Sequence, residues 1–228
     1  ATWSSASPDF GVQGVVDRFG QIEPTVMITV DGYHYNGKQH DIREKVHDVV
    51  ERIDSLKKVV IVPYAFDGAN TTDIRSAVTY DDFIAPFRTE KIVFEQVEFN
   101  HPLYVMFSSG TTGKPKCIVH GTGGTLLKQV SEHILHCDVA PGDRVFYFTT
   151  CGWMMWNWLM AGLAAGATLL LYDGSPFYPS GNILFDYADA EGMTLFGTSA
   201  KYIDALAKAE LKPRETHDLS TVRAMTST

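Results

Sequence analysis

The residues best suited to chemistry lie in one short, glycine-rich stretch, 108–116, which reads SSGTTGKPK. Glycine permits the positive φ angles that turn successive backbone N–H groups toward an anion. The Ser and Thr hydroxyls add hydrogen-bond donors, and the two lysines add positive charge. The pattern therefore predicts a loop that binds a polyphosphate. Its candidate ligands are Ser108, Ser109, Gly110, Thr111, Thr112, Gly113, Lys114 and Lys116.

The loop differs from the two commonest nucleotide-binding motifs. A Walker A loop needs four residues between its glycines and a Ser or Thr after its lysine. Here two residues separate Gly110 from Gly113, and Pro115 follows Lys114. The dinucleotide-binding pattern GxGxxG is absent as well. A flexible surface turn rich in Ser, Thr and Gly remains the alternative interpretation of this stretch.

Strands and helices alternate along the chain around this loop. The apolar residues of 41–53 fall on one helical face, and 59–62 is a continuous apolar run typical of a strand buried on both faces. Such alternation predicts an α/β fold of layered βαβ units with mostly parallel sheets. The predicted strands are 25–30, 59–62, 103–107, 117–120, 144–149, 168–172, 193–197 and 221–226, and the predicted helices are 41–53, 122–136, 154–165, 182–190 and 199–209.

The regular pattern weakens between residues 64 and 101, where turn-forming pairs such as Asp67-Gly68 interrupt it. We therefore expect two partial subdomains. Residues 1–100 would form a first βα layer, and residues 101–228 would form the part that carries the phosphate loop.

Composition excludes several classes of protein. The 228 residues carry a net charge of −8, which argues against a nucleic-acid-binding protein. The longest apolar stretch, 158–172, is interrupted by two glycines and is short for a membrane span. Three cysteines without a CxxC pair predict neither a disulfide framework nor a zinc site, and we expect no metal ligands in the chain. Free thiols indicate a reducing compartment, the cytoplasm.

The order SSGTTGKPK, placed between two apolar strands, resembles the phosphate-binding motif of the AMP-forming acyl-CoA synthetases. This family belongs to the superfamily of adenylate-forming ligases. The resemblance runs along the whole chain and points to the acetoacetyl-CoA synthetases in particular. The segments that carry it, besides the loop, are 1–11, 17–24, 31–38, 119–124, 151–158 and 171–177.

The resemblance implies a fold and a two-step reaction. The chain would be part of the large N-terminal domain of an adenylate-forming enzyme. Acetoacetate would attack the α-phosphorus of ATP to give acetoacetyl-AMP and pyrophosphate, and the thiol of CoA would then displace AMP. Mg²⁺ would bridge the phosphates. The family's adenine loop, ribose-binding motif, hinge and C-terminal domain are not in the sequence, so we expect an internal fragment that is inactive alone and carries no assigned catalytic residue.

The same resemblance implies roles for individual residues. Four residues of the loop would hold the β- and γ-phosphates, with Lys114 as an additional cation: Ser109, Thr111, Thr112 and Lys116. Lys38 matches a position that contacts CoA phosphates in related enzymes, with an ordinary surface lysine as the alternative.

Three residues of the segment 151–158 would line a short acyl pocket: Trp153, Met154 and Met155. Trp and Met at the start of a buried helix are more often part of a core, which is the alternative for these three.

Two other functions stay open. One is a ligase of the same superfamily that acts on acetate or propionate. The other is a non-catalytic module that binds a nucleotide or a protein partner. The sequence does not specify the oligomeric state.

Overall fold

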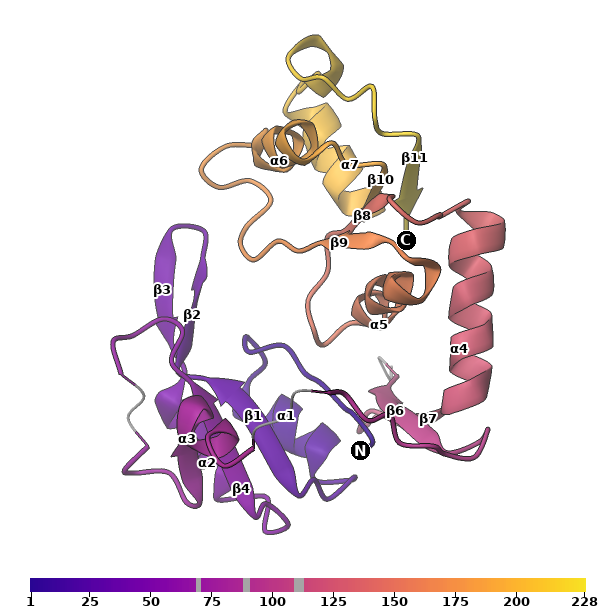
Figure 1. Ribbon diagram of the computed structural model, residues 1–228. Coiled ribbons are helices and arrows are strands. Elements are labelled where there is room, and N and C mark those ends of the chain that lie inside the picture. The colour runs from indigo at the N-terminus through magenta and orange to yellow at the C-terminus, as the bar shows by residue number, and fades with distance from the viewer. Residues whose placement is uncertain (69–70, 88–90, 109–112) are drawn as a thin grey trace. The chain divides into compact units, whose positions relative to one another are not determined.

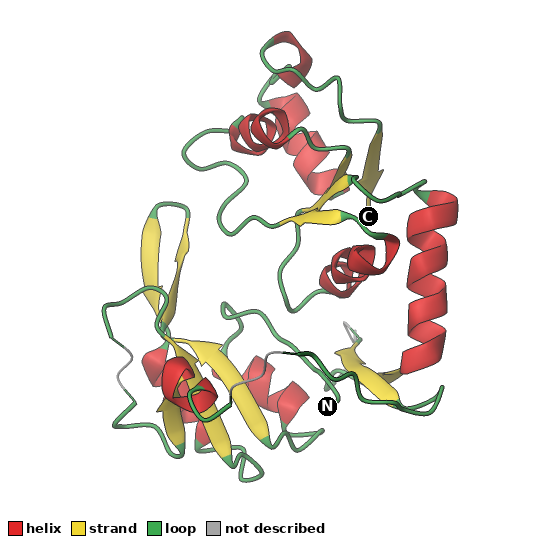
Figure 2. Cartoon of the chain, viewed as in Figure 1, coloured by secondary structure: helices red, strands yellow, loops and turns green. Residues whose placement is uncertain are grey.

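Two parallel sheets organise the chain, one in each half (Figures 1 and 2). The computed structural model describes residues 1–68, 71–87, 91–108 and 113–228. By internal contacts it divides into the units Ala1–His120 and Gly121–Thr228. The expected division after residue 100 concerns subdomains of a larger domain and stays a prediction.

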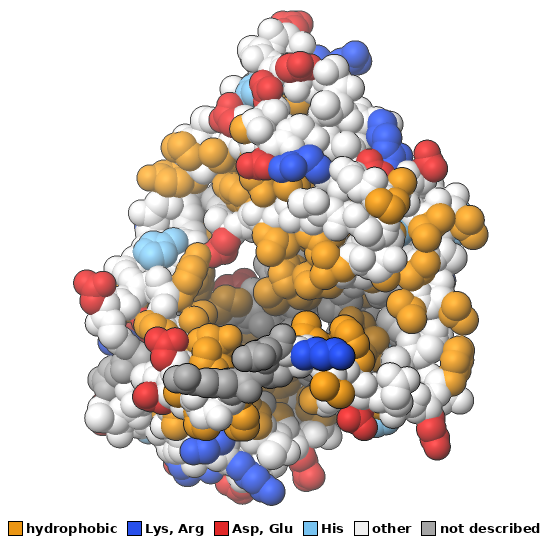
Figure 3. Space-filling view, viewed as in Figure 1, with side chains coloured by type: hydrophobic (Ala, Val, Ile, Leu, Met, Phe, Trp, Pro, Cys, Tyr) orange, Lys and Arg blue, Asp and Glu red, His pale blue; other side chains and the backbone are white. Residues whose placement is uncertain are grey.

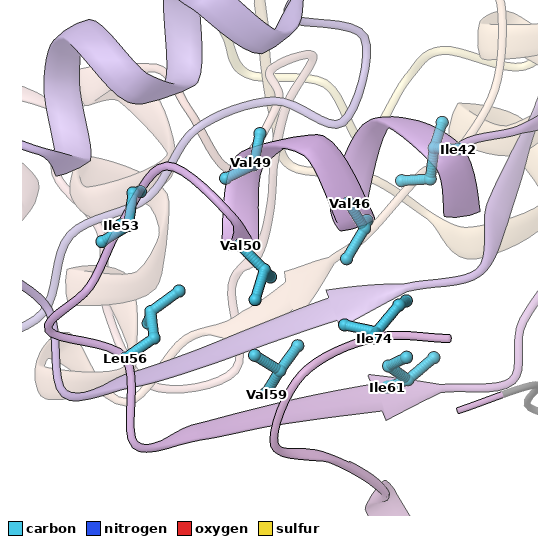
Figure 4. Close-up of a cluster of buried hydrophobic side chains, with 9 residues drawn as sticks. All are labelled: Ile42, Val46, Val49, Val50, Ile53, Leu56, Val59, Ile61 and Ile74. Carbon is cyan, nitrogen blue, oxygen red and sulfur yellow. The ribbon is translucent and has the colours of Figure 1, made fainter. Parts of the chain in front are cut away.

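The sheet of the first unit consists of β1 (Val26–Val30), β4 (Lys58–Val62) and β5 (Ala77–Thr79), which are parallel and lie in that order. Helix α2 (Arg43–Val50) packs on it, because its apolar residues recur on one face. Figure 4 shows the resulting core of nine residues from the helix, the sheet and their connections. The members of this core are Ile42, Val46, Val49, Val50, Ile53, Leu56, Val59, Ile61 and Ile74.

Two further helices complete this layer. The helix α1 (Val12–Phe19) contributes partly buried apolar side chains to the same core, and α3 (Tyr80–Ile84) follows β5 directly. Thr79 caps α3 by accepting a hydrogen bond from the Asp82 N–H. Neither helix was predicted from the sequence, because each is short and α3 lies in the stretch of weak periodicity.

A hairpin of β2 (Gly32–Tyr35) and β3 (Lys38–Asp41) leaves the sheet at the end of β1. Its turn uses Asn36 and Gly37 at φ angles of 52° and 73°, the positive values that a tight hairpin turn requires. The buried Asp31 carboxylate accepts hydrogen bonds from the backbone N–H groups of Tyr64 (3.0 Å) and Ala65 (2.9 Å). It thereby joins the ends of β1 and β4.

The sheet of the second unit is also parallel, in the order β11 (Ala224–Ser227), β10 (Leu195–Thr198), β8 (Arg144–Tyr147) and β9 (Thr168–Leu170). Alternate strand residues point to opposite faces. Val145 and Leu195 therefore pack with α5 (Met154–Ala161), whereas Phe146 and Phe196 pack with α6 (Ile183–Glu191) and α7 (Ala200–Lys208). The layered α/β fold with mostly parallel sheets is confirmed.

The remaining helical segments flank these layers. Helix α4 (Thr122–Ser131) continues as one π-helical turn, η1 (Glu132–His136), while η2 (Gly162–Ala165) and η3 (Pro213–Glu215) are 3₁₀ turns. The outer face of α4 and η1 leaves Leu126, Leu127 and Leu135 exposed, and Figure 3 shows apolar side chains along this helix. Among the helices of the described ranges, none has the length and apolar character to cross a membrane.

Candidate functional site

The phosphate-loop stretch lies between two paired strands of the first unit, β6 (Pro102–Phe107) and β7 (Cys117–Gly121). The Ser108 N–H donates to the Lys116 carbonyl at 3.0 Å, and the Lys116 N–H donates to Ser108 Oγ at 3.1 Å. These two bonds close the base of the loop. They hold the incoming arm, which ends at Ser108, against the outgoing arm, 113–116.

The outgoing arm carries the two lysines of the motif. Lys114 and Lys116 are exposed. Lys128, Lys208 and Lys212 form ion pairs with carboxylates, whereas within the described ranges Lys114 and Lys116 do not. Both ammonium groups therefore lie on a fixed arm without a carboxylate to neutralise them, and an incoming anion would meet two positive charges.

The glycine of this arm has the conformation that the motif predicts. Gly113 has a φ angle of +96°, and a Cβ atom built on it would meet nothing within 4 Å. The backbone angle, rather than lack of space, is what favours glycine here. Four predicted ligands lie outside the described residues, and their roles stay predictions: Ser109, Gly110, Thr111 and Thr112.

Contacts from outside the loop reach both of its arms. The side-chain amide of Gln21 donates to the Pro115 carbonyl at 2.9 Å, and the Phe19 ring lies 6.4 Å from the Phe107 ring. Sequence reasoning missed Gln21, because nothing in a single glutamine signals a contact with a residue 94 positions away.

A residue from the beginning of the chain forms an isolated β-bridge with β6. The Trp3 N–H donates to the Leu103 carbonyl at 2.8 Å, and the Val105 N–H donates to the Trp3 carbonyl at 2.9 Å. Trp3 thus pairs with the middle of β6, at Tyr104, and β6 leads from there to Ser108.

Lys38, the predicted CoA contact, begins β3 at the tip of the hairpin and pairs in register with Tyr35. Its side chain is exposed. The structure leaves it accessible to an anionic ligand, and its role in binding CoA stays a prediction.

The three predicted acyl-pocket residues have different environments. Trp153 precedes α5 and is 60% exposed, and Met154 is 48% exposed. Met155 is only 7% exposed and belongs to the core that includes Trp158 and Leu159. Only Trp153 and Met154 present substantial surface to a ligand, whereas Met155 fixes the start of the helix against the sheet.

The carboxyl edge of the second sheet gathers several hydroxyl groups. The Tyr147 ring lies over Gly197, where an added Cβ would come within 2.1 Å of it. Its hydroxyl lies 3.0 Å from the Thr198 carbonyl, to which it donates, and 3.1 Å from Thr228 Oγ1. Within the described residues, the buried Thr198 and Thr226 hydroxyls have no hydrogen-bond partner. The carboxyl edge of a parallel sheet is the usual ligand-binding edge of α/β proteins.

Ionisable groups in the second unit give little support to acid–base or metal chemistry. Burial lowers the pKa of His133, which stacks on Trp158 with ring centroids 4.1 Å apart. Burial likewise raises the pKa of the Tyr202 hydroxyl. In the part of the chain that the structure describes, no three His, Cys, Asp or Glu side chains come together as metal ligands.

Comparison with known proteins agrees with the resemblance read from the sequence. Residues 1–228 match the family of AMP-binding enzymes. The chain is 60% identical to an acetoacetyl-coenzyme A synthetase of Rhizobium meliloti (strain 1021) and 49% identical to an acetoacetyl-CoA synthetase of Danio rerio. A malonamoyl-CoA synthetase of Penicillium aethiopicum is 41% identical. All of this chain aligns in each case, with 35%, 35% and 34% of the respective relatives.

A solved structure shows the same fold. The acetoacetyl-CoA synthetase from Streptomyces lividans superposes with a TM-score of 0.92 at 43% sequence identity, over all of this chain and 34% of that protein. The chain thus spans about a third of the length of the relatives that it matches. The expectation that it forms part of an adenylate-forming domain is confirmed. By its sequence along all 228 residues and by its fold, this chain belongs to the family of AMP-binding enzymes.

Proposed function

We propose that this chain supplies the phosphate-binding loop of an AMP-forming acetoacetate–CoA ligase. The observation that carries the proposal is the pair of exposed lysines, Lys114 and Lys116, on a loop arm whose base is fixed by Ser108. Phosphoryl and adenylyl transfer require positioned positive charge more than covalent help from the protein. A fixed arm with two exposed ammonium groups, which pair with no carboxylate among the described residues, meets that requirement.

In the proposed reaction the acetoacetate carboxylate attacks the α-phosphorus of ATP, and the bond to the pyrophosphate oxygen breaks. Lys116 and Lys114 hold the β- and γ-phosphates and stabilise the negative charge that grows on the departing pyrophosphate. The thiol of CoA then attacks the acyl carbon of acetoacetyl-AMP, which releases AMP and a proton. Lys38 is the proposed contact of this chain with the CoA phosphates.

The relatives' names support a particular class of acid. Acetoacetate and malonamate both carry a carbonyl group two carbons from the carboxyl carbon, and the names of the three relatives above refer to these acids. We therefore propose a short acid with a β-carbonyl as the substrate, in preference to acetate or propionate. Trp153 and Met154 are the residues whose exposed surfaces support a role in contacting it.

Mg²⁺ is expected to accompany the nucleotide. The described residues contain no cluster of three ligand side chains, so we assign the ion no ligand in this chain and no step of the reaction. For localisation we propose the cytoplasm, a proposal supported by Cys117 and Cys137, which take part in no disulfide bond within the described residues.

A titration of the 228-residue chain with ATP tests the proposal. We expect binding that depends on the triphosphate and that weakens at least about tenfold in Lys116→Met, because a hydrogen bond to a charged group contributes about 1.5–3 kcal/mol. Lys38→Met is the matched control, since it removes an equal charge from the hairpin and should leave ATP affinity unchanged. Absence of nucleotide binding would favour a module that binds a protein partner.

A second measurement addresses the reaction itself. Hydroxylamine trapping with ATP and acetoacetate should give no product with this chain alone, and rapid product formation would contradict our expectation of an inactive part. In a full-length protein that carries this chain, acetoacetate should outcompete acetate and propionate. Preference for either of the latter would reassign the substrate.

A further inference from the structure

The end of helix α1 contacts both arms of the phosphate loop. Phe19, the last residue of the helix, lies beside Phe107, the residue that precedes Ser108, with ring centroids 6.4 Å apart. Gln21 lies two positions further and donates to the Pro115 carbonyl on the outgoing arm at 2.9 Å. One short turn of backbone thus reaches the incoming and the outgoing arms together.

The Gln21 amide also bonds to its own helix. Its NH₂ group donates to the Asp17 carbonyl at 2.6 Å, one of the carbonyls that the end of a helix leaves without an internal partner. Because the two hydrogens of one amide serve Asp17 and Pro115, the loop arm is linked to the helix through a single planar group.

This link complements the bonds that close the loop. Ser108 holds the N–H and the carbonyl of Lys116 from inside the loop. Gln21 holds the Pro115 carbonyl from outside. The peptide group that joins Pro115 to Lys116 is therefore held from two sides, its carbonyl by Gln21 and its N–H by Ser108, directly beside the residues that carry the positive charge.

The backbone that carries Gln21 is itself tightly placed. Gly20 lies so close to the preceding turn that an added Cβ would come within 2.7 Å of the Val16 carbonyl oxygen. The Gln21 N–H donates to the Arg18 carbonyl at 3.1 Å. The position from which Gln21 reaches the loop is thus set by the end of the helix.

From these contacts we propose that Gln21 is a positioning residue for the phosphate loop, setting the course of the arm that carries Lys114 and Lys116. The proposal rests on the proposed function of that loop. An arm fixed before the ligand arrives loses less conformational freedom on binding, and this is how a residue that touches no phosphate raises affinity. A residue that only capped α1 would bond to Asp17 and leave the loop unaffected.

The test compares Gln21→Met with Gln13→Met in the full 228-residue chain. Methionine keeps the length of the side chain and removes the amide. Gln13 lies on the same helix and donates to Asp17 Oδ1 at 2.8 Å without reaching the loop. The probes are ATP and inorganic tripolyphosphate, titrated by calorimetry, and hydrogen exchange of the backbone amides without ligand.

We expect Gln21→Met to bind both probes roughly 3- to 10-fold more weakly, the loss that one ordinary hydrogen bond supports. The Lys116 and Ser108 amides should exchange faster in this variant. Gln21→Asn should behave similarly, because it keeps the amide but shortens its reach. Gln13→Met should leave affinity and exchange unchanged, even if it lowers the unfolding temperature.

The outcomes separate the two proposals. If the unmodified chain binds neither probe, the proposed function is wrong, and exchange alone decides whether Gln21 holds the arm. Unchanged exchange at Lys116 and Ser108 in Gln21→Met would overturn the positioning role. So would unchanged affinity in a chain that does bind the probes.

Discussion

The phosphate loop, 108–116, and the acyl segment, 151–158, which contains the predicted acyl-pocket residues, both come after a strand. Their described side chains differ in how far they are buried. In the loop, Lys114 and Lys116 are exposed, and the backbone around them is fixed at its base by Ser108. In the acyl segment, Trp153 is 60% exposed while Met155 is 7% exposed and packs in the core. The two lysines of the loop are exposed to solvent, whereas one of the three predicted acyl-pocket residues, Met155, belongs to the core.

The difference explains why one motif is easier to interpret than the other. Gly, Ser, Thr and Lys in this order contribute little to a hydrophobic core, so their presence between two strands points to a ligand. Trp and Met are equally suited to a core and to an acyl pocket. A pattern of apolar residues in the sequence cannot distinguish a core from an acyl pocket, because that distinction requires the exposed fraction of each side chain.

The largest expected effect separates the acyl residues from one another. Met155→Ala should lower the free energy of unfolding by about 2–5 kcal/mol, because it removes a buried side chain and leaves a cavity. Met154→Ala, at a position 48% exposed, should cost much less. Urea unfolding measures both, and equal losses would contradict the assignment of Met155 to the core.

A smaller effect is expected at the glycine of the loop. Gly113→Ala should destabilise the arm by about 1–2 kcal/mol, the cost of a side chain at a positive φ angle. ATP should bind more weakly as a result. Gly124→Ala is the matched control, since its added Cβ also meets nothing within 4 Å but lies in helix α4.

Alanine favours a helix over glycine, so the control should keep or raise stability. If both variants behave alike, the backbone angle of Gly113 is not what the loop requires.

The smallest effect concerns charge. The arms of the phosphate loop are joined by hydrogen bonds between uncharged groups. In the second unit, an ion pair at 2.7 Å between Arg223 and Asp143 instead links the residue before β11 to the turn before β8. Burial raises the pKa of this carboxyl, but hydrogen bonds from Arg223 and the Ala140 N–H outweigh it, and the pKa lies below its ordinary value.

A carboxyl whose pKa is lower in the folded state stabilises the protein above its unfolded-state pKa and loses that contribution as the pH falls through the folded-state value. Asp143→Asn should therefore cost at most about 1 kcal/mol near pH 7, as is typical of such pairs. The difference from the unmodified chain should begin to shrink as the pH falls below about 4, the ordinary pKa of an Asp carboxyl, and should vanish only below the lower folded-state value. Urea unfolding at both pH values measures it, and a constant difference would contradict the role of the pair.

The sequence predicts the helices and strands whose buried residues form a continuous or periodic apolar run. Strand β4 and helix α2 stand out because Val59 and Val50 belong to continuous or periodic apolar runs. The β2–β3 hairpin was missed, because polar residues such as Lys38 and Gln39 fill it and only the Asn36-Gly37 turn marks it.

Hydrogen bonds between residues far apart in the chain leave no recognisable pattern in the sequence around either residue. The buried Asp31 carboxylate and the Gln21 amide each hold a backbone segment far along the chain, and neither residue type predicts such a partner. For the candidate site, composition and spacing point to Lys114 and Lys116, which the structure leaves exposed, and their role in binding phosphate stays a prediction. The separation of Met155 from Trp153 depends on how α5 lies on the sheet, which composition does not specify.

Hydrogen exchange of the chain with and without ATP tests most directly whether the loop is the nucleotide-binding site. The account predicts slower exchange at the Ser108 and Lys116 amides when ATP is bound, no such change in Lys116→Met, and little change near Met155. Protection confined to the acyl segment, or no ATP-dependent protection at the loop, would contradict it.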